Sequence, residues 1–535
     1  MRRHAMIDAV SGEIGPKTGP AAEGRATMQG SDGRIEDIPL DRGGEIPLHR
    51  QLRRHFTRMI DDNRLGDGDY LPSTRELAER LGINRLTALR AFQAMHRAGI
   101  VRVQPGRGYY VAKRQDQAMT GGMPRELFGA PATYEAHPES AFSETVRSAR
   151  DMPLSFAVGY PDISMLPLKQ IRRLFARWSD VFAGGDLAYQ APGGHPMLRQ
   201  QLWRYLEERG IAKTDDRELL VTNGAQHALD IFVRTFQKDT GMAATETPAY
   251  YGALAVIRLN GYTALPILQD DQGLSVASLA ALCKTRRFDF LYTNPTFNNP
   301  TGRTLSRQRR QAVLELAREY QFTVLEDDTY ADLGFGGARP LSLTAMDGEN
   351  RVCHIGSFSK SFMPGLRMGY IVGPKAAVQR MADIHGVNDM CSSTLSQLVL
   401  FDALESGFYD RHVKRMRAAY AKRCRVMGEV MREEMTSGCR FTVPKGGFFY
   451  WIRLPERIDC RELRQRCNAV GVDVALGPDF FGEGFGGNYI RLNFTLLDEP
   501  DIRLGIRLIS TQIKAMMDAS RADPGAADQP PPGLA

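Results

Sequence analysis

Lys360 lies in a segment whose residue types suit covalent chemistry with an aldehyde. The segment GSFSKSFMPGLRMGY, residues 356–370, surrounds this lysine with small and hydroxylated residues and places Arg367 seven positions after it. A lysine amine forms an imine with an aldehyde, and a guanidinium holds a phosphate. Pyridoxal phosphate carries both groups, so the segment predicts a site for this cofactor. For an isolated SxxK, the alternative is a lysine in a surface turn.

Two further segments could complete such a site. In VTNGAQH (221–227), a strand-like run leads into a turn of small residues that opens a helix, and backbone N–H groups at a helix N-terminus bind phosphate. The run FTVLEDDTY (322–330) is typical of a buried strand that ends in acids. An acid beside the pyridine nitrogen keeps that nitrogen protonated and makes the ring an electron sink. Asp327 and Asp328 are both candidates, and the position of Tyr330 favours Asp327.

These segments, with PAY (248–250), NNPTG (298–302) and YIRLNF (489–494), resemble in content and order the motifs of fold-type I aminotransferases of class I and II. The resemblance covers about residues 150–515. It implies an α/β domain with a mainly parallel sheet and a small C-terminal α/β subdomain, with pyridoxal phosphate as the cofactor.

The same resemblance implies a role for individual residues, and no metal is expected among them. Lys360 is implied as the catalytic residue and covalent anchor of the cofactor. The other implied contacts are Asp327 at the pyridine nitrogen, Tyr330 and Asn299 at the ring oxygen, Tyr250 on the ring face, Gly224, Ala225, Gln226 and Arg367 around the phosphate, Ser357 as a further cofactor contact, Tyr189 at the phosphate of a partner chain, and Arg491 and Gly159 at the substrate, with Arg491 on its α-carboxylate.

The positive charge of the chain is concentrated in one short segment. Residues 42–114 hold 15 Lys and Arg against 7 Asp and Glu, whereas the rest of the chain is close to neutral and the whole carries a formal net charge of +7. A basic patch confined to one small domain is the electrostatic footprint of nucleic-acid binding. A solvated charged face is the alternative that charge alone leaves open.

The basic segment has the helix and turn signals of a winged helix-turn-helix. Ser73 and Asn84 are good N-cap residues before two amphipathic runs, and Gly82 lies between these runs as a helix stop. A glycine-rich tip joins two short β-like runs after the last helix. The predicted elements are helices at 46–60, 74–81 and 85–98 and a hairpin at 100–111.

This segment resembles the DNA-binding domain of the GntR superfamily through LPSTRELAERLGINRLTALRAFQAM (71–95) and the wing PGRGYYV (105–111). The resemblance implies that the second helix of the motif enters the major groove. Leu86 stands where a polar residue is usual, and each arginine could contact phosphate rather than a base. The implied DNA contacts are Arg75, Asn84, Arg85, Thr87 and Arg107.

The combination of the two parts resembles the MocR family of bacterial regulators. It implies a homodimer formed through the aminotransferase-like domain, double-stranded operator DNA as a partner, and a signal that is pyridoxal phosphate itself or an amine or amino acid that reacts with it at Lys360. A working aminotransferase with a fused DNA-binding domain is the alternative, because the chain lacks no residue that transamination needs. The expected organisation is a disordered tail at 1–43, the DNA-binding domain at 44–112, a linker at 113–150, the aminotransferase-like domain at 151–517 and a disordered tail at 518–535.

The composition predicts a cytoplasmic protein without membrane contact. The seven cysteines are scattered and form no CxxC pair, as is typical of reduced thiols. The first residues lack the apolar core of a secretory signal, and no apolar run approaches the roughly 18 residues of a membrane helix.

Overall fold

The structure is a computed structural model that describes two units, one within residues 1–135 and one within residues 136–535. Each unit is described by itself. The predicted linker at 113–150 lies outside the described residues. These are residues 38–42, 47–61, 64–66, 68–97, 100–104, 107–111, 152–181, 188–236, 238, 241–336, 339–481 and 488–522.

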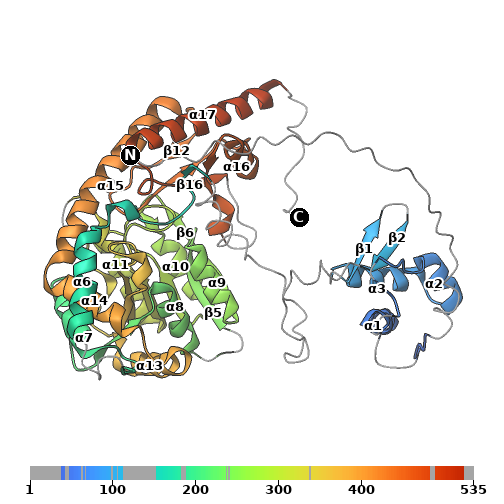
Figure 1. Ribbon diagram of the computed structural model, residues 1–535, viewed down its shortest axis with the longest axis horizontal. Helices are drawn as coiled ribbons and strands as arrows, with labels where there is room; N and C mark the ends of the chain where they lie inside the picture. The colour runs from blue at the N-terminus through green and yellow to red at the C-terminus, as the bar shows by residue number, and fades with distance from the viewer. Residues whose placement is uncertain are drawn as a thin grey trace. The chain divides into compact units, whose positions relative to one another are not determined.

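Three helices and a two-stranded hairpin form the smaller unit (Figure 1). The second helix begins where Ser73 Oγ accepts the N–H of Glu76 at 3.1 Å, and it ends at Gly82, whose φ of 58° lies in the left-handed region. Asn84 Oδ1 accepts the N–H of Leu86 at 2.8 Å and so caps the third helix. The predicted winged helix-turn-helix is therefore confirmed. Its elements are α1 (Leu48–Asp61), α2 (Thr74–Leu81), α3 (Arg85–Arg97), β1 (Val101–Gln104) and β2 (Gly108–Val111).

The chain just before α1 belongs to this unit at residues 38–42, which the sequence analysis assigned to a disordered tail. Ile38 is buried in the apolar core that α1, α2 and α3 share. Arg42 Nη2 donates to the carbonyl of Leu81 at 2.8 Å and so satisfies a backbone acceptor at the end of α2. The sequence led us to expect that the domain begins at residue 44, so these residues extend it towards the N-terminus. The composition of a segment does not show that one apolar side chain within it, that of Ile38, is buried.

An eight-stranded sheet forms the centre of the larger unit, and its spatial order is β4-β11-β10-β9-β8-β5-β6-β7. Neighbours from β10 through β6 pair in parallel, whereas β11 is antiparallel to both of its neighbours and β7 is antiparallel to β6. The mainly parallel sheet is as predicted. The strands are β4 (Arg217–Thr222), β5 (Gly241–Thr247), β6 (Tyr262–Asp270), β7 (Gly273–Leu274), β8 (Phe290–Thr293), β9 (Thr323–Asp327), β10 (Val352–Ser357) and β11 (Gly369–Pro374).

Helices cover both faces of this sheet. Successive residues of a strand point to opposite faces, so Leu220 packs in the core with α8, α9 and α13, while Leu219 and Val221 pack with α7 and α14 on the other face. Helices α10, α11 and α12 extend that second layer over the remaining strands. The helices are α6 (Leu168–Val181), α7 (Pro196–Glu207), α8 (Ala225–Arg234), α9 (Tyr251–Leu259), α10 (Val276–Thr285), α11 (Arg307–Tyr320), α12 (Leu343–Met346), α13 (Lys375–Asp389) and α14 (Thr394–Glu405).

A second apolar core lies in the C-terminal part of the larger unit, between an antiparallel sheet of order β12-β13-β16-β15 and long helices. The chain at 154–160 joins this part, because β3 pairs with β14 and Asn493 donates its N–H to the carbonyl of Phe156 at 2.8 Å. The last helix continues to Ala522, past the expected boundary at 517. The elements are β3 (Leu154–Ser155), α15 (Phe408–Glu434), β12 (Arg440–Phe441), β13 (Phe449–Arg453), α16 (Cys460–Ala469), β14 (Val472–Asp473), β15 (Ala475–Leu476), β16 (Tyr489–Asn493) and α17 (Glu499–Ala522).

All seven cysteines are free thiols, as their scattered positions predict. Within the described ranges, none of the helices combines the length and the apolar character that a bilayer crossing requires.

The cap at Ser73 yields a stability prediction for the smaller unit. Replacing Ser73 with Ala removes the acceptor of the Glu76 N–H, and loss of such a cap lowers the free energy of unfolding by about 1 kcal/mol. Hydrogen exchange of the α2 amides in the full chain measures this loss. Ser73→Asn, which keeps an acceptor at the N-cap, is expected to retain wild-type protection. Equal protection in Ser73→Ala and wild type would contradict the assigned role of the cap.

Candidate cofactor and effector site

Lys360 follows β10 at the edge of the sheet where the parallel strands end. Its Nζ donates to the carbonyl of Gly159 at 2.8 Å and lies 5.8 Å from the centre of the Tyr160 ring. Burial is the main cause that lowers the pKa of Lys360 to about 8, and the charges of Arg367 and Arg491 lower it further. A larger fraction of this amine is therefore neutral and nucleophilic at physiological pH than of an exposed lysine.

The turn between β4 and α8 and the guanidinium of Arg367 form a cup for an anion. Gly224 has a φ of 87° and is the N-cap of α8, so the first N–H groups of the helix lie beside it. Arg367 Nη2 donates to the carbonyl of Asn223 at 3.3 Å, and its Nη1 donates to Ser359 Oγ at 3.4 Å. A Cβ at Gly224 would lie 2.9 Å from Arg367 Nη2, which explains glycine at this position. Helix N–H groups and a guanidinium together favour a phosphate.

The other residues predicted at the phosphate divide into two groups. Ala225 is the first residue of α8 and lies beside the cup, and Ser357, at the end of β10 on the same edge of the sheet, accepts the N–H of Ser359 at 3.2 Å with its Oγ. The side chain of Gln226 instead contacts α9, where its Nε2 donates to the carbonyl of Gly252 at 2.9 Å and its Oε1 accepts from Tyr250 Oη at 3.2 Å. Gln226 thus fixes the ring of Tyr250 rather than lining the cup with its side chain.

The structure separates the roles of the two adjacent acids. Asp327 ends β9 and pairs with Ile355, so it shares the face of the sheet on which α8 packs. Its carboxylate accepts from Tyr292 Oη at 2.9 Å and from Thr329 Oγ1 at 2.6 Å, and burial raises its pKa. Asp328 is buried and ion-pairs with Arg339 at 3.3 Å. The assignment of Asp327 to the pyridine nitrogen stays a prediction.

Two buried tyrosines, Tyr250 and Tyr330, lie near Asp327. Burial raises the pKa of Tyr250 well above its usual value, and the nearby groups that raise it further include Tyr330 and Asp327. Tyr330 is buried with its ring 5.3 Å from that of Phe448, and burial also raises its pKa. The phenols therefore stay protonated and remain hydrogen-bond donors.

Arg491 is a buried guanidinium that forms no ion pair with any described carboxylate. It is 1% exposed on β16, and its Nη1 donates to Asn299 Oδ1 at 2.9 Å while its Nη2 donates to the carbonyl of Ala157. Its Nε has no hydrogen-bond partner among the described residues. The guanidinium carbon lies 4.1 Å from the ring centre of Phe449. A buried cation with a free donor is a binding site for an anion.

Two predicted residues sit at the margin of this arrangement. Gly159 reaches the site through its carbonyl, which accepts from Lys360, and a Cβ there would lie 3.3 Å from Phe449. Tyr189 is 78% exposed, and no described contact brings it to the cup of its own chain. That exposure suits a residue that serves a partner chain, which remains a prediction.

Sequence reasoning missed a buried hydrogen-bond network that holds Asn299. Glu246 accepts from Asn298 Nδ2 at 2.6 Å and from the N–H of Asn294 at 3.2 Å, and Asn294 Oδ1 accepts the N–H of Asn299 at 2.7 Å. Burial raises the pKa of Glu246 to about 7 despite these bonds. A single sequence carries little signal for Glu246, because a polar residue near a strand end is common in any loop. Ser359, which contacts Arg367, lay inside the lysine segment and could have been named.

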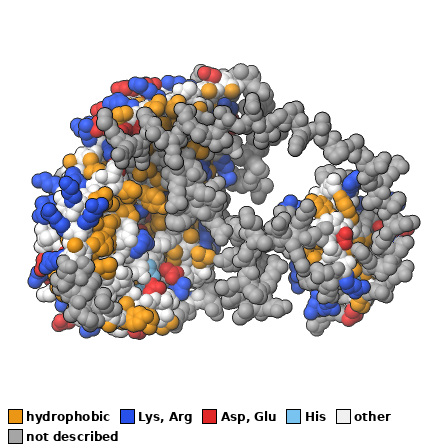
Figure 2. All heavy atoms as spheres, viewed as in Figure 1, with side chains coloured by type: hydrophobic (Ala, Val, Ile, Leu, Met, Phe, Trp, Pro, Cys, Tyr) orange, Lys and Arg blue, Asp and Glu red, His pale blue; other side chains and the backbone are white. Residues whose placement is uncertain are grey.

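The predicted DNA contacts lie at the surface of α2, α3 and the hairpin. Arg75, Asn84, Arg85 and Arg107 are exposed, and Thr87 is half-buried. The three arginines form no ion pair within the described ranges, so their charge is available to a phosphate or a base edge. Figure 2 shows Lys and Arg side chains on the visible face of this unit. Leu86 is 51% exposed, so the first turn of α3 also presents an apolar contact.

Comparisons with known proteins match both units. A family model of aminotransferase class I and II matches residues 160–503, and a model of bacterial regulatory proteins of the gntR family matches residues 48–111. The aromatic-amino-acid aminotransferase 1 of Thermococcus litoralis is 31% identical over 68% of this chain and 88% of its own. The uncharacterized HTH-type transcriptional regulator YisV of Bacillus subtilis is 27% identical over 89% of this chain and 98% of its own.

Solved structures agree with the fold of the larger unit. The crystal structure of Pyrococcus horikoshii kynurenine aminotransferase superposes with a TM-score of 0.69 at 31% identity, covering 75% of this chain and 99% of that chain. The layered fold and the lysine at the strand ends thus define a fold-type I aminotransferase-like protein. The chain belongs to the aminotransferase class I and II family, and it carries a gntR-family DNA-binding domain. This fusion is that of the MocR-type transcriptional regulators, and its cofactor is pyridoxal phosphate.

The residues present fit that cofactor. The cup at Gly224 and Arg367 suits its phosphate, Lys360 suits its aldehyde and Asp327 suits its pyridine nitrogen. The phenols of Tyr250 and Tyr330 are buried near Asp327 and could donate to a ring hydroxyl.

The lowered pKa of Lys360 predicts the pH dependence of cofactor capture. In protein freed of the cofactor, the rate of covalent capture of pyridoxal phosphate is expected to rise with pH and to reach half its maximum near pH 8, because the neutral amine reacts. Rapid-mixing absorbance spectroscopy measures this profile. Arg491→Gln removes a nearby positive charge and is expected to move the midpoint upward, and Lys360→Ala is expected to abolish capture. A midpoint near the ordinary lysine value of 10.5 would contradict the assignment.

Proposed function

We propose that this regulator binds operator DNA through α2, α3 and the hairpin and responds to an amino acid that reacts with pyridoxal phosphate at Lys360. The observation that carries the proposal is Arg491, a buried guanidinium that forms no ion pair with a carboxylate of the described residues and that lies near a lysine of lowered pKa. The α-carboxylate of an amino acid would bind Arg491 while its amine occupies the position of the Lys360 amine. An amine without a carboxylate remains an alternative effector.

The energetics of Arg491 support a carboxylate ligand. A buried, unpaired charge is costly, and burial lowers the pKa of this guanidinium. Asn299 and Ala157 satisfy two of its nitrogens, and Phe449 and Phe480 cover the planar group at 4.1 and 4.7 Å. These contacts hold the side chain in place and exclude water, while Nε keeps a free donor. A carboxylate therefore finds a positioned donor at little cost in side-chain entropy.

The remaining groups orient the reacting amine and handle its protons. When bound, pyridoxal phosphate supplies an aldehyde carbon for the amine and a ring that withdraws electrons. Lys360 lies within hydrogen-bond distance of the Gly159 carbonyl, so its nitrogen stays at the site after it leaves the cofactor. Asp327, fixed by Tyr292 and Thr329, would hold a proton on the pyridine nitrogen.

We further propose that the larger unit forms the homodimer. Large apolar side chains are exposed on it, notably Tyr189 at 78%, Val387 at 86% and Met390 at 55%. Figure 2 shows hydrophobic side chains gathered on the visible face of this unit. A second copy would cover such a surface, and Tyr189 would then approach the phosphate cup of the partner. The DNA-binding domain at 44–112 and the sensor at 151–517 would be joined by the linker at 113–150.

A working aminotransferase is the second candidate function. The lowered pKa of Lys360, about 8, suits a general base near neutral pH. The two candidates are separated by turnover. Repeated release of keto acid product with 2-oxoglutarate supports the enzyme, whereas a spectral response to an amino acid without turnover, coupled to a change in DNA affinity, supports the regulator.

The role of Arg491 predicts a selective loss of response. With a panel of amino acids and amines, absorbance of the bound cofactor identifies the best responder. Arg491→Gln is expected to weaken that response about tenfold or more, because a hydrogen bond to a charged group contributes about 1.5–3 kcal/mol. Cofactor binding is expected to persist. Arg453→Gln, an exposed arginine on the neighbouring strand β13, is the matched control. An unchanged response in Arg491→Gln would overturn the assignment.

The DNA-binding surface predicts a second selective loss. Duplexes selected from a random library by the full-length protein serve as operator probes. Arg85→Gln is expected to weaken binding about tenfold, because a guanidinium contact to a base edge contributes about 1–3 kcal/mol. Arg58→Gln removes an exposed charge from α1 and is expected to change affinity little. Fluorescence anisotropy at fixed salt measures both, and equal losses in the two variants would indicate a non-specific charge effect instead.

A further inference from the structure

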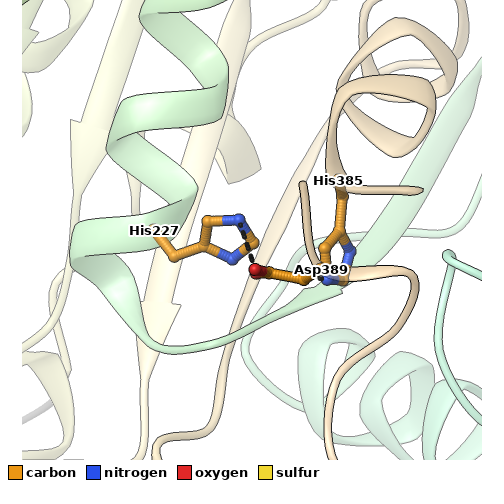
Figure 3. A group of neighbouring side chains, drawn as sticks. All are labelled: His227, His385 and Asp389. Carbon is orange, nitrogen blue, oxygen red and sulfur yellow. Dashed lines mark ion pairs between the residues drawn. The ribbon is translucent and has the colours of Figure 1, made fainter. Parts of the chain in front are cut away.

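Two histidines and an aspartate lie close together beside the turn between β4 and α8, and the proposed function uses none of them. His227 comes from the first turn of α8, and His385 and Asp389 lie one turn apart on α13 (Figure 3). His227 Nε2 lies 3.4 Å from Asp389 Oδ2, and His385 Nε2 lies 4.0 Å from the same oxygen. One ligand atom from each side chain lies within 4.8 Å of the other two.

His385 is an independent sign that this cluster serves a ligand. Its side chain is 0% exposed, and neither ring nitrogen meets hydrogen-bond geometry with a described residue, although the Pro192 carbonyl lies beside the ring. A buried polar group left without a partner costs about 1–3 kcal/mol. Figure 3 shows the rings of both histidines beside the carboxylate of Asp389. A buried imidazole that lacks a partner next to a second imidazole and a carboxylate is the arrangement expected of a metal ligand set.

We propose that His227, His385 and Asp389 bind one first-row transition metal ion of the Zn²⁺ type, with water completing its coordination. Imidazole and carboxylate ligands suit Zn²⁺, which most often has four ligands. At bond lengths of about 2.1 Å, tetrahedral ligand atoms lie about 3.4 Å apart. The pair of His227 and Asp389 already has this spacing, and His385 Nε2 lies 4.0 Å from the same carboxylate oxygen.

The proposed metal site is linked to the turn between β4 and α8 through Asn223. The Asn223 side chain donates to Asp389 Oδ2 at 2.7 Å and its backbone N–H donates to His227 Nδ1 at 3.2 Å. A metal on Nε2 leaves the remaining ring proton on Nδ1, so this backbone N–H must give up its acceptor when the metal binds. Asn223 directly precedes Gly224, and its carbonyl accepts from Arg367.

Metal titration of the full chain tests the proposal. The protein, loaded with pyridoxal phosphate and prepared without a histidine tag, is treated with chelator and dialysed against micromolar Zn²⁺ or Co²⁺. We expect one ion per chain by elemental analysis and visible Co²⁺ absorption bands of a site with imidazole ligands. Asp389→Asn and His385→Gln are each expected to weaken binding at least about tenfold.

Asp383→Asn is the matched control, because it removes an exposed carboxylate from the same helix outside the cluster. It is expected to bind metal like the wild type. Thermal unfolding of the metal-free proteins shows whether each variant keeps its fold, and Asp389→Asn is the decisive one because Asp389 is partly exposed. Absence of stoichiometric binding, or binding that Asp389→Asn and His385→Gln leave unchanged, would overturn the proposal. Neither result bears on the amino-acid response at Lys360.

Discussion

The buried guanidinium of Arg491 is the constraint on which the site of the larger unit depends. Burial is the largest cause that disfavours the charge of Lys360, the exposed Arg367 and the buried Arg491 disfavour it further, and Asp327 opposes them. Such an arrangement is costly in isolation. The hydrogen bonds of Arg491 to Asn299 and to the backbone hold it without neutralising it. The site is therefore complementary to a ligand with two negative groups, one at each end.

The order of the strands explains how residues far apart in the chain reach this site. In a sheet whose strands are mostly parallel, the carboxyl ends of the strands meet at one edge. β4 ends at the turn that precedes α8, β9 ends at Asp327, and β10 ends shortly before Lys360. Arg491 comes from β16 of the C-terminal sheet and crosses to Asn299 at 2.9 Å. One side chain thus joins the two cores of the larger unit.

Local patterns predicted much of this arrangement, and the rest depended on contacts that no local pattern contains. The side chains of Ser73 and Asn84 each accept an N–H group from the first turn of the helix that follows, so the sequence alone predicts these caps. Strand alternation places Asp327 on the face of α8, which the sequence could only infer from a nearby tyrosine. Glu246 supports Asn299 through two other asparagines, a chain of tertiary contacts.

The histidine cluster is a second case in which tertiary packing, rather than a local sequence pattern, brings the residues together. His385 and Asp389 have helical spacing, but His227 comes from a different helix, and only the packing of α8 against α13 brings the three together. The family resemblance, with which no metal is expected at the cofactor site, says nothing of such a contact elsewhere in the fold. Ile38 is a comparable case, because its burial depends on a gap between helices rather than on its neighbours in sequence.

A regulator needs a ligand that distinguishes two states of the protein, and the shift it causes is bounded by its difference in affinity for them. Arg491 belongs to the C-terminal sheet, whereas Lys360 and the phosphate cup belong to the central sheet. A ligand that spans both would stabilise the arrangement in which the two sheets are held together. An amine without a carboxylate reaches Lys360 but leaves Nε of Arg491 unpaired. The difference is one charge-assisted interaction, about 1.5–3 kcal/mol, which corresponds to roughly a tenfold to hundredfold change in the balance of states. Discrimination of amino acids from simple amines therefore follows from the same buried charge that the fold must hold in place.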